Sequence, residues 1–166
     1  MNVIDELGIL AISTRLQRMS ERLRRDGGQI YKLNGIAFEP KWFPVIYTLQ
    51  QKPLLGVMEI ANEIGYTHPS TISLLKELEK QQLVKSVRDK TDERKRLVRL
   101  TPKATALIAD MQPVWRIMTQ ALAELTDTTN NLLQALNEVE EQLEHKSFLQ
   151  RAKELMKEEK AVKKKK

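Results

Sequence analysis

Apolar residues recur at three- and four-residue intervals along most of the chain, which is the spacing of one face of an α-helix. Proline and glycine divide this pattern into segments. Pro69 and Pro102 stand where a first helical turn would begin, and Gly65 stands where a helix would end. The pattern predicts helices over about residues 3–26, 40–49, 57–64, 69–82, 102–125 and 127–157.

Glycine and proline also fall in less favourable places. Gly27 and Gly28 follow the first predicted helix, and two successive glycines are expected to weaken or bend it. Pro44 falls in the second predicted helix, where its ring would either shorten the first turn or kink the helix.

Residues 83–101 break the helical spacing. Residues 83–87 and 97–100 are apolar or β-branched at most positions, and the residues between them are nearly all charged. Burial of so many charges would require a partner for each, so this connection must reach into water or toward a polyanion. The segment is typical of a β-hairpin with a charged tip.

The order of these elements predicts the fold class. A short helix over residues 57–64, a turn at Tyr66 and Thr67, a second helix over residues 69–82 and then a hairpin follow one another as in a winged helix-turn-helix. We therefore predict a mostly α-helical fold with a small β-hairpin wing, flanked by N- and C-terminal dimerisation helices.

The terminal helices carry more apolar surface than one small lobe can cover, which favours a homodimer. We expect an N-terminal dimerisation helix over residues 1–35, a winged helix-turn-helix DNA-binding lobe over residues 36–101 and C-terminal dimerisation helices over residues 102–157. Residues 158–166 are expected to form a disordered, lysine-rich tail.

Charge is distributed unevenly along the chain. The formal net charge is +6, but residues 66–103 alone carry +5, residues 104–156 carry −4 and residues 157–166 carry +4. The overall basicity therefore matters less than the local excess on the second helix and the hairpin, which indicates a nucleic-acid partner.

Composition excludes several classes of mechanism. The chain has no cysteine, which excludes disulfides, thiolate metal ligands and thiol redox sensing. An acidic pair precedes the first short apolar run, unlike in a signal peptide, and no apolar run has the roughly 18 residues that span a membrane. We expect a cytoplasmic protein without a cofactor.

The N-terminal part of the second helix would face DNA. Small polar side chains there let the backbone approach base edges in the major groove. An ordinary solvated helix face is the alternative interpretation. The candidate contacts on this helix and the preceding turn are Thr67, His68, Ser70, Thr71, Ser73 and Lys76.

The hairpin supplies further candidates. Its cations can bind phosphates or enter a narrow minor groove, and Asp92 can orient the Arg94 guanidinium through a bidentate pair. A solvated, charge-rich turn is the alternative. The candidate contacts are Arg88, Lys90, Asp92, Arg94, Lys95 and Arg96.

The segment DERKRLVRLT resembles the wing signature of the MarR family of bacterial transcription regulators, in which Asp-x-Arg is followed by an apolar position, Leu-Thr and a long helix. Asp92, Arg94, Val98, Leu100 and Thr101 match its five positions. GVMEIANEIGYTHPSTISLLKELEKQQLV is similar to the two DNA-binding helices of that family, and FEPKWFPVIYTLQ to its entry segment.

Three positions depart from that pattern. Near Ser73 the family often has Arg or Gln that reads bases, so the preferred DNA sequence stays open. At Gln82 it usually has Gly as a helix stop, so Gln82 is expected to lengthen or fray the helix. The run Lys163–Lys166 has no counterpart and is either a nonspecific DNA-holding arm or a solvated tail.

The resemblance also implies a pocket, between the dimerisation helices and the DNA-binding lobe, for a small aromatic or anionic ligand that loosens DNA. Large apolar residues at helical spacing usually pack in a core, and this alternative applies to each candidate. The candidate lining residues are Tyr31, Phe38, Trp42, Met111 and Trp115.

Enzyme signals are poor, since His68 and His145 lie far apart and no phosphate-binding or metal-binding motif occurs. The resemblance implies a ligand-responsive repressor that binds a pseudo-palindromic operator as a homodimer. An architectural or constitutive DNA-binding protein without ligand sensing, and a helical protein-interaction module, are the alternatives.

Overall fold

The computed structural model describes residues 2–88 and 96–163 of the chain. Lys90, Asp92, Arg94 and Lys95, which are predicted DNA contacts, lie outside the described residues. Two compact units make up the chain, Met1–Met118 and Thr119–Lys166, and helix α6 contributes to both.

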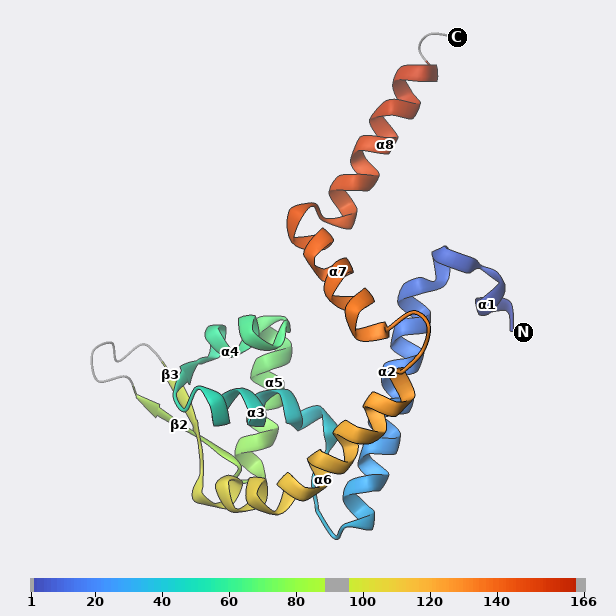
Figure 1. The fold of residues 1–166 in the computed structure, drawn as a ribbon. Coiled ribbons are helices and arrows are strands. Elements are labelled where there is room, and N and C mark those ends of the chain that lie inside the picture. Colours follow the sequence, from blue (N-terminus) through green and yellow to red (C-terminus); the bar gives the residue numbers. More distant parts are fainter. Residues whose placement is uncertain (1, 89–95, 164–166) are drawn as a thin grey trace. The chain divides into compact units, whose positions relative to one another are not determined.

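The fold is mostly helical with a small antiparallel sheet, as predicted (Figure 1). Short 3₁₀-helices are labelled η. In chain order the elements are α1 (Val3–Glu6), η1 (Gly8–Ala11), α2 (Ile12–Leu33), η2 (Pro40–Trp42), α3 (Phe43–Gln51), β1 (Leu55–Gly56), α4 (Val57–Ile64), α5 (His68–Lys80), β2 (Val84–Arg88), β3 (Arg96–Leu100), α6 (Pro102–Thr126), α7 (Leu132–His145) and α8 (Phe148–Lys163).

The prediction of one N-terminal helix ending near Gly27 is wrong at both ends. The chain breaks at Gly8, which has a φ of +59°, and α2 then continues through Gly27 and Gly28 to Leu33. A Cβ atom at Gly27 would lie 3.4 Å from the methyl carbon of Met118. Gly27 therefore serves close packing rather than bending.

Pro44 causes the shorter first turn that was one of its two expected effects. Residues Pro40–Trp42 form η2, and α3 begins only at Phe43. Pro44 consequently lies in the first turn of α3, where no intrahelical bond needs its missing N–H group.

The sheet has the strand order β1-β3-β2 with antiparallel pairing throughout. The hairpin was predicted from sequence, whereas β1 was not. β1 pairs Leu55 with Val98. Because β1 is only two residues long, it has no alternating pattern from which it could be predicted.

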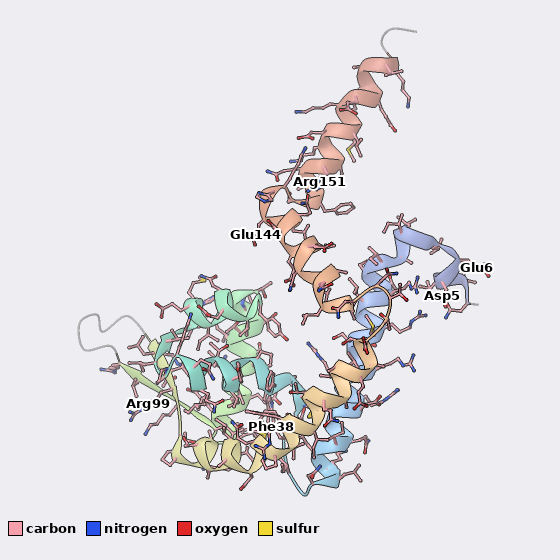
Figure 2. All side chains as sticks on the ribbon, in the orientation of Figure 1. Asp5, Glu6, Phe38, Arg99, Glu144 and Arg151 are labelled. Atoms are coloured by element: carbon pink, nitrogen blue, oxygen red, sulfur yellow. The ribbon has the colours of Figure 1, made fainter. Side chains whose placement is uncertain are left out.

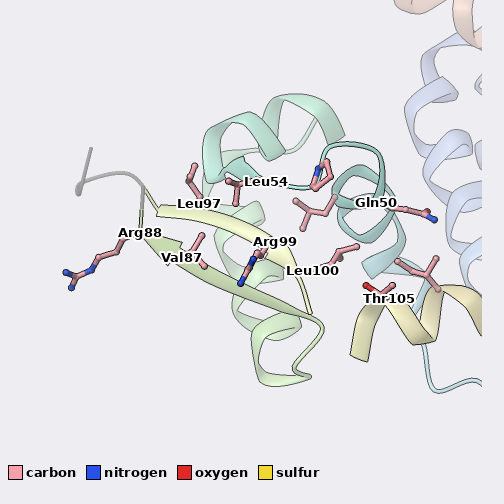
Figure 3. A pocket seen from close by; sticks show the side chains of 11 residues that line it. Gln50, Leu54, Val87, Arg88, Leu97, Arg99, Leu100 and Thr105 are labelled. Atoms are coloured by element: carbon pink, nitrogen blue, oxygen red, sulfur yellow. The ribbon is translucent and has the colours of Figure 1, made fainter. Parts of the chain in front are cut away.

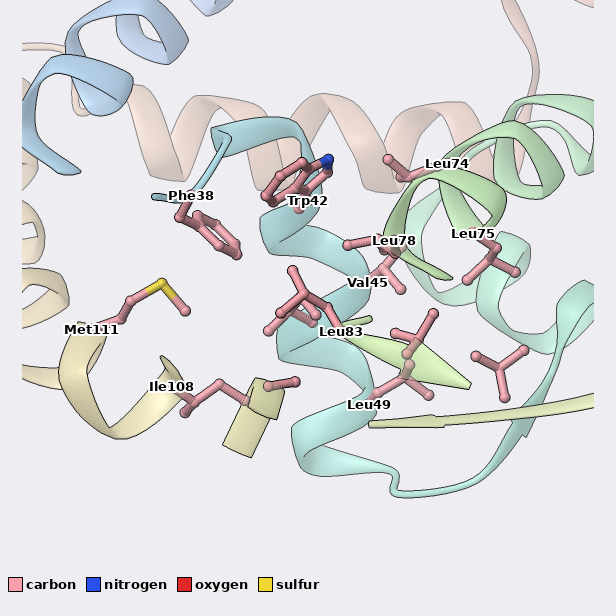
Figure 4. Close-up of a cluster of buried hydrophobic side chains, with 14 of the residues drawn as sticks. Phe38, Trp42, Val45, Leu49, Leu74, Leu75, Leu78, Leu83, Ile108 and Met111 are labelled. Atoms are coloured by element: carbon pink, nitrogen blue, oxygen red, sulfur yellow. The ribbon is translucent and has the colours of Figure 1, made fainter. Parts of the chain in front are cut away.

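The core lies in the first unit, where α3, α4, α5, α6 and the sheet meet (Figure 4). Figure 4 shows Val45 and Leu49 of α3 facing Leu78 of α5 and Ile108 of α6. Each fully buried aliphatic side chain contributes about 1.5–3 kcal/mol relative to exposure. This packing fixes α5 and the wing in one arrangement.

The C-terminal unit holds two helices where one long helix was expected. Ser147 separates them: its hydroxyl accepts a hydrogen bond from the Gln150 N–H at 3.2 Å, and the Gln150 side chain accepts one from the Ser147 N–H at 2.8 Å. This is a capping box, which begins a new helix. The cap of α7 is Asn131, so this helix begins at Leu132 and not near residue 127 as predicted.

The lysine-rich end also differs from expectation. Helix α8 runs to Lys163, so the segment predicted to be disordered from residue 158 is helical to that point. Residues 164–166 lie outside the described part of the chain.

Candidate nucleic-acid interface

Helix α5 presents a polar face at its N-terminal end. The Thr67 hydroxyl caps the helix by accepting a hydrogen bond from the Ser70 N–H at 3.3 Å, and Gly65, at a φ of +69°, ends α4 just before it. The side chains of His68, Ser70, Ser73 and Lys76 are exposed. They come from three successive turns, as an edge that enters a groove requires.

Thr71 does not belong to that face. It is fully buried, and its hydroxyl donates to the Thr67 carbonyl at 3.0 Å. The buried stripe of α5 runs through Thr71, Leu74, Leu75 and Leu78, whereas the spacing of Leu75 and Leu78 alone would place Ile72 on it. A small β-branched residue fits there because its one polar atom is satisfied by the preceding turn. Thr71 is a core residue, and its assignment to DNA is wrong.

Arg96 is predicted to contact DNA, but the structure engages it inside the protein. One guanidinium nitrogen lies 2.6 and 2.7 Å from the two carboxylate oxygens of Glu79 in α5, and Nε donates to the Ser86 hydroxyl in β2. Ser86 donates in turn to Glu79 at 2.5 Å. These three residues tie the wing to the last turn of α5.

The ionisation of Glu79 reflects these contacts. Partial burial raises the pKa of its carboxyl, but the hydrogen bonds from Arg96 and Ser86 outweigh burial, and the net pKa lies below the usual value. Glu79 is therefore stabilised in its charged form, as the partner of Arg96.

A second ion pair ties α5 to η2. The Lys41 ammonium lies 2.8 Å from the Glu77 carboxylate, which also accepts a hydrogen bond from the Trp42 indole at 2.9 Å. The Lys41 contact, followed by the Trp42 contact, lowers the pKa of Glu77. The same contact to Glu77 raises the pKa of Lys41.

The sequence analysis did not predict these two ion pairs, in which Glu77 binds Lys41 and Glu79 binds Arg96. Local sequence offered no signal for them, because the partners Lys41 and Arg96 are far from α5 along the chain. What local sequence did show was a charged helix end, which is equally typical of a solvated surface.

Gln82 takes the role that glycine has in the family pattern. Its φ is +60°, and α5 ends at Lys80 instead of lengthening as expected. The Leu83 N–H donates to the Leu78 carbonyl at 2.9 Å, which closes the helix as a left-handed stop does. The Thr101 hydroxyl donates to the Gln82 carbonyl at 2.7 Å and fixes this turn.

The wing brings Arg88 to the end of β2, where its side chain is exposed and adjoins residues outside the description. Its pairing partner in the register is Arg96. The exposed Arg88 stays a candidate phosphate contact, and the orienting pair of Asp92 and Arg94 stays a prediction from sequence.

The ligand candidates form a packed aromatic chain. Tyr31 and Phe38 meet edge to face with centroids 5.0 Å apart, Phe38 and Trp42 do so at 5.6 Å, and the Trp115 indole donates to the Tyr31 hydroxyl at 2.8 Å. Burial raises the pKa of Tyr31, and the bond from Trp115 partly opposes that rise. Met111 is fully buried beside them. These residues are part of the core, as the alternative interpretation held.

Other classes of site find little support. Among residues 2–88 and 96–163, no three histidine, aspartate or glutamate side chains gather into a possible metal site. Within the same residues, no helix is both long enough and apolar enough to span a membrane.

Comparison with known proteins connects this geometry to a family. Residues 38–95, from the end of the N-terminal helix region to the wing, match the model of the MarR family. No curated protein sequence matches the chain.

Solved structures share the fold. The transcriptional repressor CouR, bound to a 23-mer DNA duplex, is 26% identical, with a TM-score of 0.65 over 80% of this chain and 96% of that chain. A mutant MarR from E. coli complexed with operator DNA is 19% identical, with a TM-score of 0.66 over 86% and 99%. BpsR from Bordetella bronchiseptica, whose DNA binding is regulated by 6-hydroxynicotinic acid, is 19% identical, with a TM-score of 0.64 over 80% and 92%.

The family match covers the helix-turn-helix and the first strand of the hairpin, and the shared fold extends over most of the chain. The wing residues that resemble the family signature, Val98 to Thr101, lie in β3 and at the start of α6, as a wing followed by a long helix requires. Residues 38–95 therefore match the MarR family, and the chain shares the fold of CouR and of the MarR mutant.

Proposed function

We propose that the chain is a sequence-specific, double-stranded DNA-binding regulator that acts as a homodimer on a pseudo-palindromic operator. The observation that carries the proposal is the arrangement of α5. Its buried face and the carboxylates of Glu77 and Glu79 hold it to the protein, which leaves Ser70, Ser73 and Lys76 free on an exposed edge. A helix held this way fits the major groove of B-DNA.

Dimerisation follows from unburied apolar surface in each unit. In the N-terminal elements, Ile9 and Leu10 are 83% and 80% exposed; in the C-terminal unit, Phe148 is 78% exposed. Patches of this kind mark interaction surfaces, and a second copy supplies the same surface by symmetry. We propose that residues 1–35 and 102–157 form that interface.

The dimer claim is tested by sedimentation of the whole chain and of a variant with Val139→Asp and Leu143→Asp in α7. Both side chains are about half exposed, at 57% and 49%, so the charges should leave the lobe folded and separate the copies. A native chain that sediments as a monomer at micromolar concentration contradicts the proposal.

Selection of bound duplexes from a random pool tests sequence specificity. A dimer with two α5 helices should enrich two related half-sites with centres about 10 base pairs apart. Enrichment of one unpaired site, or of no sequence at all, contradicts the proposed operator. Complete indifference to duplex DNA at low salt would instead favour a protein-interaction module.

Phosphate contacts are tested by the salt dependence of binding. Lys76→Ala should reduce the slope of log affinity against log salt by about 1, because one fewer phosphate contact releases its counterion. Lys153→Ala, on α8, is the matched control and should leave the slope unchanged. Arg94→Ala tests the sequence-based wing prediction in the same way.

We also propose that the regulator is a repressor that a small aromatic or anionic ligand releases from DNA. A ligand can shift the dimer only if it binds the conformation with lower DNA affinity more tightly. Titration of phenolic acids into the DNA complex tests this: dissociation supports a sensor, and an unchanged complex supports a constitutive regulator.

A further inference from the structure

A hydrogen bond joins the long N-terminal helix to the helix-turn-helix. The Arg24 guanidinium of α2 donates to the Tyr66 hydroxyl, in the turn between α4 and α5, at 3.2 Å. The two residues are 42 positions apart along the chain, so the tertiary fold brings them together. The bond therefore connects α2 to the start of the helix that carries the candidate DNA contacts.

Arg24 differs in this from its neighbours in α2. Arg18 lies 2.5 Å from Asp5, which Figure 2 labels in the N-terminal helix α1, and Arg25 lies 3.6 Å from Asp26. Those two ion pairs stay within the N-terminal elements. Arg24 instead binds a neutral hydroxyl group of the helix-turn-helix.

The packing of α2 sets the direction in which Arg24 extends. Gly27, Gly28 and Tyr31 follow it at three-, four- and seven-residue intervals, so all of them lie on one face of α2. Tyr31 is 2% exposed, and a Cβ atom at Gly27 would lie 3.6 Å from the ring of Pro40 in η2. This face is therefore fixed against η2 and the core, and Arg24 extends from its next turn.

Tyr66 lies directly before the DNA-facing helix. Gly65 ends α4 with a φ of +69°, and Thr67 caps α5. The Tyr66 N–H donates to the Ala61 carbonyl at 3.0 Å, and its side chain packs against the core while its hydroxyl binds Arg24. A restraint on the Tyr66 side chain is therefore a restraint on the N-terminal end of α5.

A second tie holds α5 further along its length. Glu77 binds Lys41 of η2 at 2.8 Å, and η2 lies against the face of α2 that carries Gly27. Glu77 follows Thr67 by ten residues, which is about 15 Å along a helix axis. A single tie would let α5 pivot relative to α2, whereas two ties this far apart define the direction of its axis.

The bond lies outside the groove of the first unit. The end of α3, the hairpin and the start of α6 line that groove, as Figure 3 shows for Gln50, Val87 and Thr105. Neither Arg24 nor Tyr66 lines it. The role of the bond is therefore independent of any ligand held there.

We propose that Arg24 is a positioning residue for DNA recognition, which holds the N-terminal end of α5 at one angle to α2 without touching DNA. The consequence for recognition rests on the proposed DNA-binding function, but the angle is a property of the free chain. Loss of the bond should leave α5 folded and broaden its range of orientations. A smaller fraction of molecules then presents the angle that fits the major groove, and the apparent affinity falls by that fraction.

Spin-label distances in the full-length chain without DNA test the angle directly. Because the chain has no cysteine, Ser20→Cys on α2 and Ser73→Cys on α5, both exposed, take one label each. An excess of unlabelled chain restricts the measured distances to labels within one molecule. Arg24→Met and Tyr66→Phe should each broaden the distance distribution. Arg25→Met removes the same charge one residue along and should leave it unchanged.

An equally narrow distribution in Arg24→Met and Tyr66→Phe overturns the proposal, whether or not the chain binds DNA. Equal broadening in Arg25→Met also overturns it, because the effect would then follow from charge alone. Thermal melting confirms that each variant is folded.

Duplex affinity tests the consequence for recognition. On a duplex selected from a random pool, Arg24→Met and Tyr66→Phe should each weaken binding about fivefold, the effect of one hydrogen bond. The double variant should bind no more weakly than either single variant, because both remove the same bond. The slope of log affinity against log salt should stay unchanged, since no phosphate contact is lost.

Two other results have distinct meanings. A slope reduced by about 1 in Arg24→Met, with native affinity in Tyr66→Phe, would overturn the proposal and show that Arg24 binds a phosphate itself. Failure of the native chain to bind any duplex would refute the proposed function, while the label distances would still decide whether Arg24 positions α5.

Discussion

The winged lobe and the C-terminal unit use the same helical periodicity with opposite results. In the lobe, Val45, Ile60 and Leu78 are completely buried. In Thr119–Lys166, no described residue is buried, and Leu133 and Leu149 are 63% and 61% exposed. Within the lobe, each helix packs its apolar face against another element. The apolar faces of α7 and α8 are exposed in the single chain.

This difference shows which part of the chain is stabilised by its own packing. An amphipathic helix gains most of its stability by burying its apolar face. The lobe does so with three helices and a sheet, so it is expected to unfold cooperatively. In the single chain, the C-terminal helices depend on local caps, such as Asn131 and Ser147; the proposed dimer would cover their apolar faces.

The largest expected difference in stability is between a leucine-to-alanine substitution in the lobe and the same substitution in the C-terminal unit. Leu78→Ala removes a fully buried side chain and should lower the free energy of unfolding by about 3 kcal/mol, because a cavity remains. Leu143→Ala, at a half-exposed position in α7, should cost at most about 0.5 kcal/mol at concentrations where the chain is monomeric. Urea denaturation measures both. Equal losses would show that α7 is buried within a single chain.

A smaller effect is expected in the aromatic chain of the first unit. Tyr31→Phe deletes the hydroxyl that accepts the Trp115 bond at 2.8 Å and should cost about 1 kcal/mol. Tyr47→Phe is the matched control, since Tyr47 is 45% exposed, and it should leave stability nearly unchanged. If the two variants have the same urea midpoint, the buried hydrogen bond does not contribute.

A substitution at the C-terminal stop of α5 should stabilise the protein. Gln82→Gly should raise the free energy of unfolding by about 0.5–1 kcal/mol, because glycine adopts the observed φ of +60° without a Cβ clash. Gln81→Gly, whose φ is −77°, provides the contrast and should be destabilising. A loss of stability in Gln82→Gly would mean that the side chain of Gln82 matters more than its backbone strain.

The smallest effect is expected at the tie between α5 and the wing. Glu79→Gln should cost about 0.5 kcal/mol at pH 7, since its partner Arg96 is partly exposed and screened by water. The folded state lowers the pKa of Glu79, so its contribution is present above the usual glutamate pKa and disappears as the pH falls through the lowered pKa. Stability curves of the native chain and the variant should therefore converge in acid. Glu144→Gln on α7 is the control, and a gap that persists in acid would refute the role of the carboxylate.

Much of the secondary structure of the lobe could be predicted from the sequence, because the signals that define it are short-range. Gly65 as a left-handed stop, Pro69 in the first turn of α5 and the two hairpin strands each depend on neighbouring residues, and all are found as predicted. The misassigned Thr71 shows the limit: a helix face is known from spacing only to within about one position, and Ile72 and Thr71 differ by one.

The terminal regions were less predictable for a related reason. The separate helices α7 and α8 follow from a capping box at Ser147 and Gln150, a signal that is present in the sequence but was hidden by a continuous apolar stripe. Gly27 lies inside α2, where Met118 and Pro40 approach it closely, and no local pattern reveals these contacts.

The sequence by itself determined the helical fold class, the order of helix, turn, helix and hairpin, and the MarR resemblance, because periodicity and turn chemistry are local. Only the tertiary structure decided the role of charged side chains. Arg96 is bound to Glu79, whereas Arg99, three residues along, has no ion-pair partner among residues 2–88 and 96–163. Which cation is neutralised depends on the strand register and on an acidic residue from another element. Neither can be predicted from the residues next to that cation in the sequence.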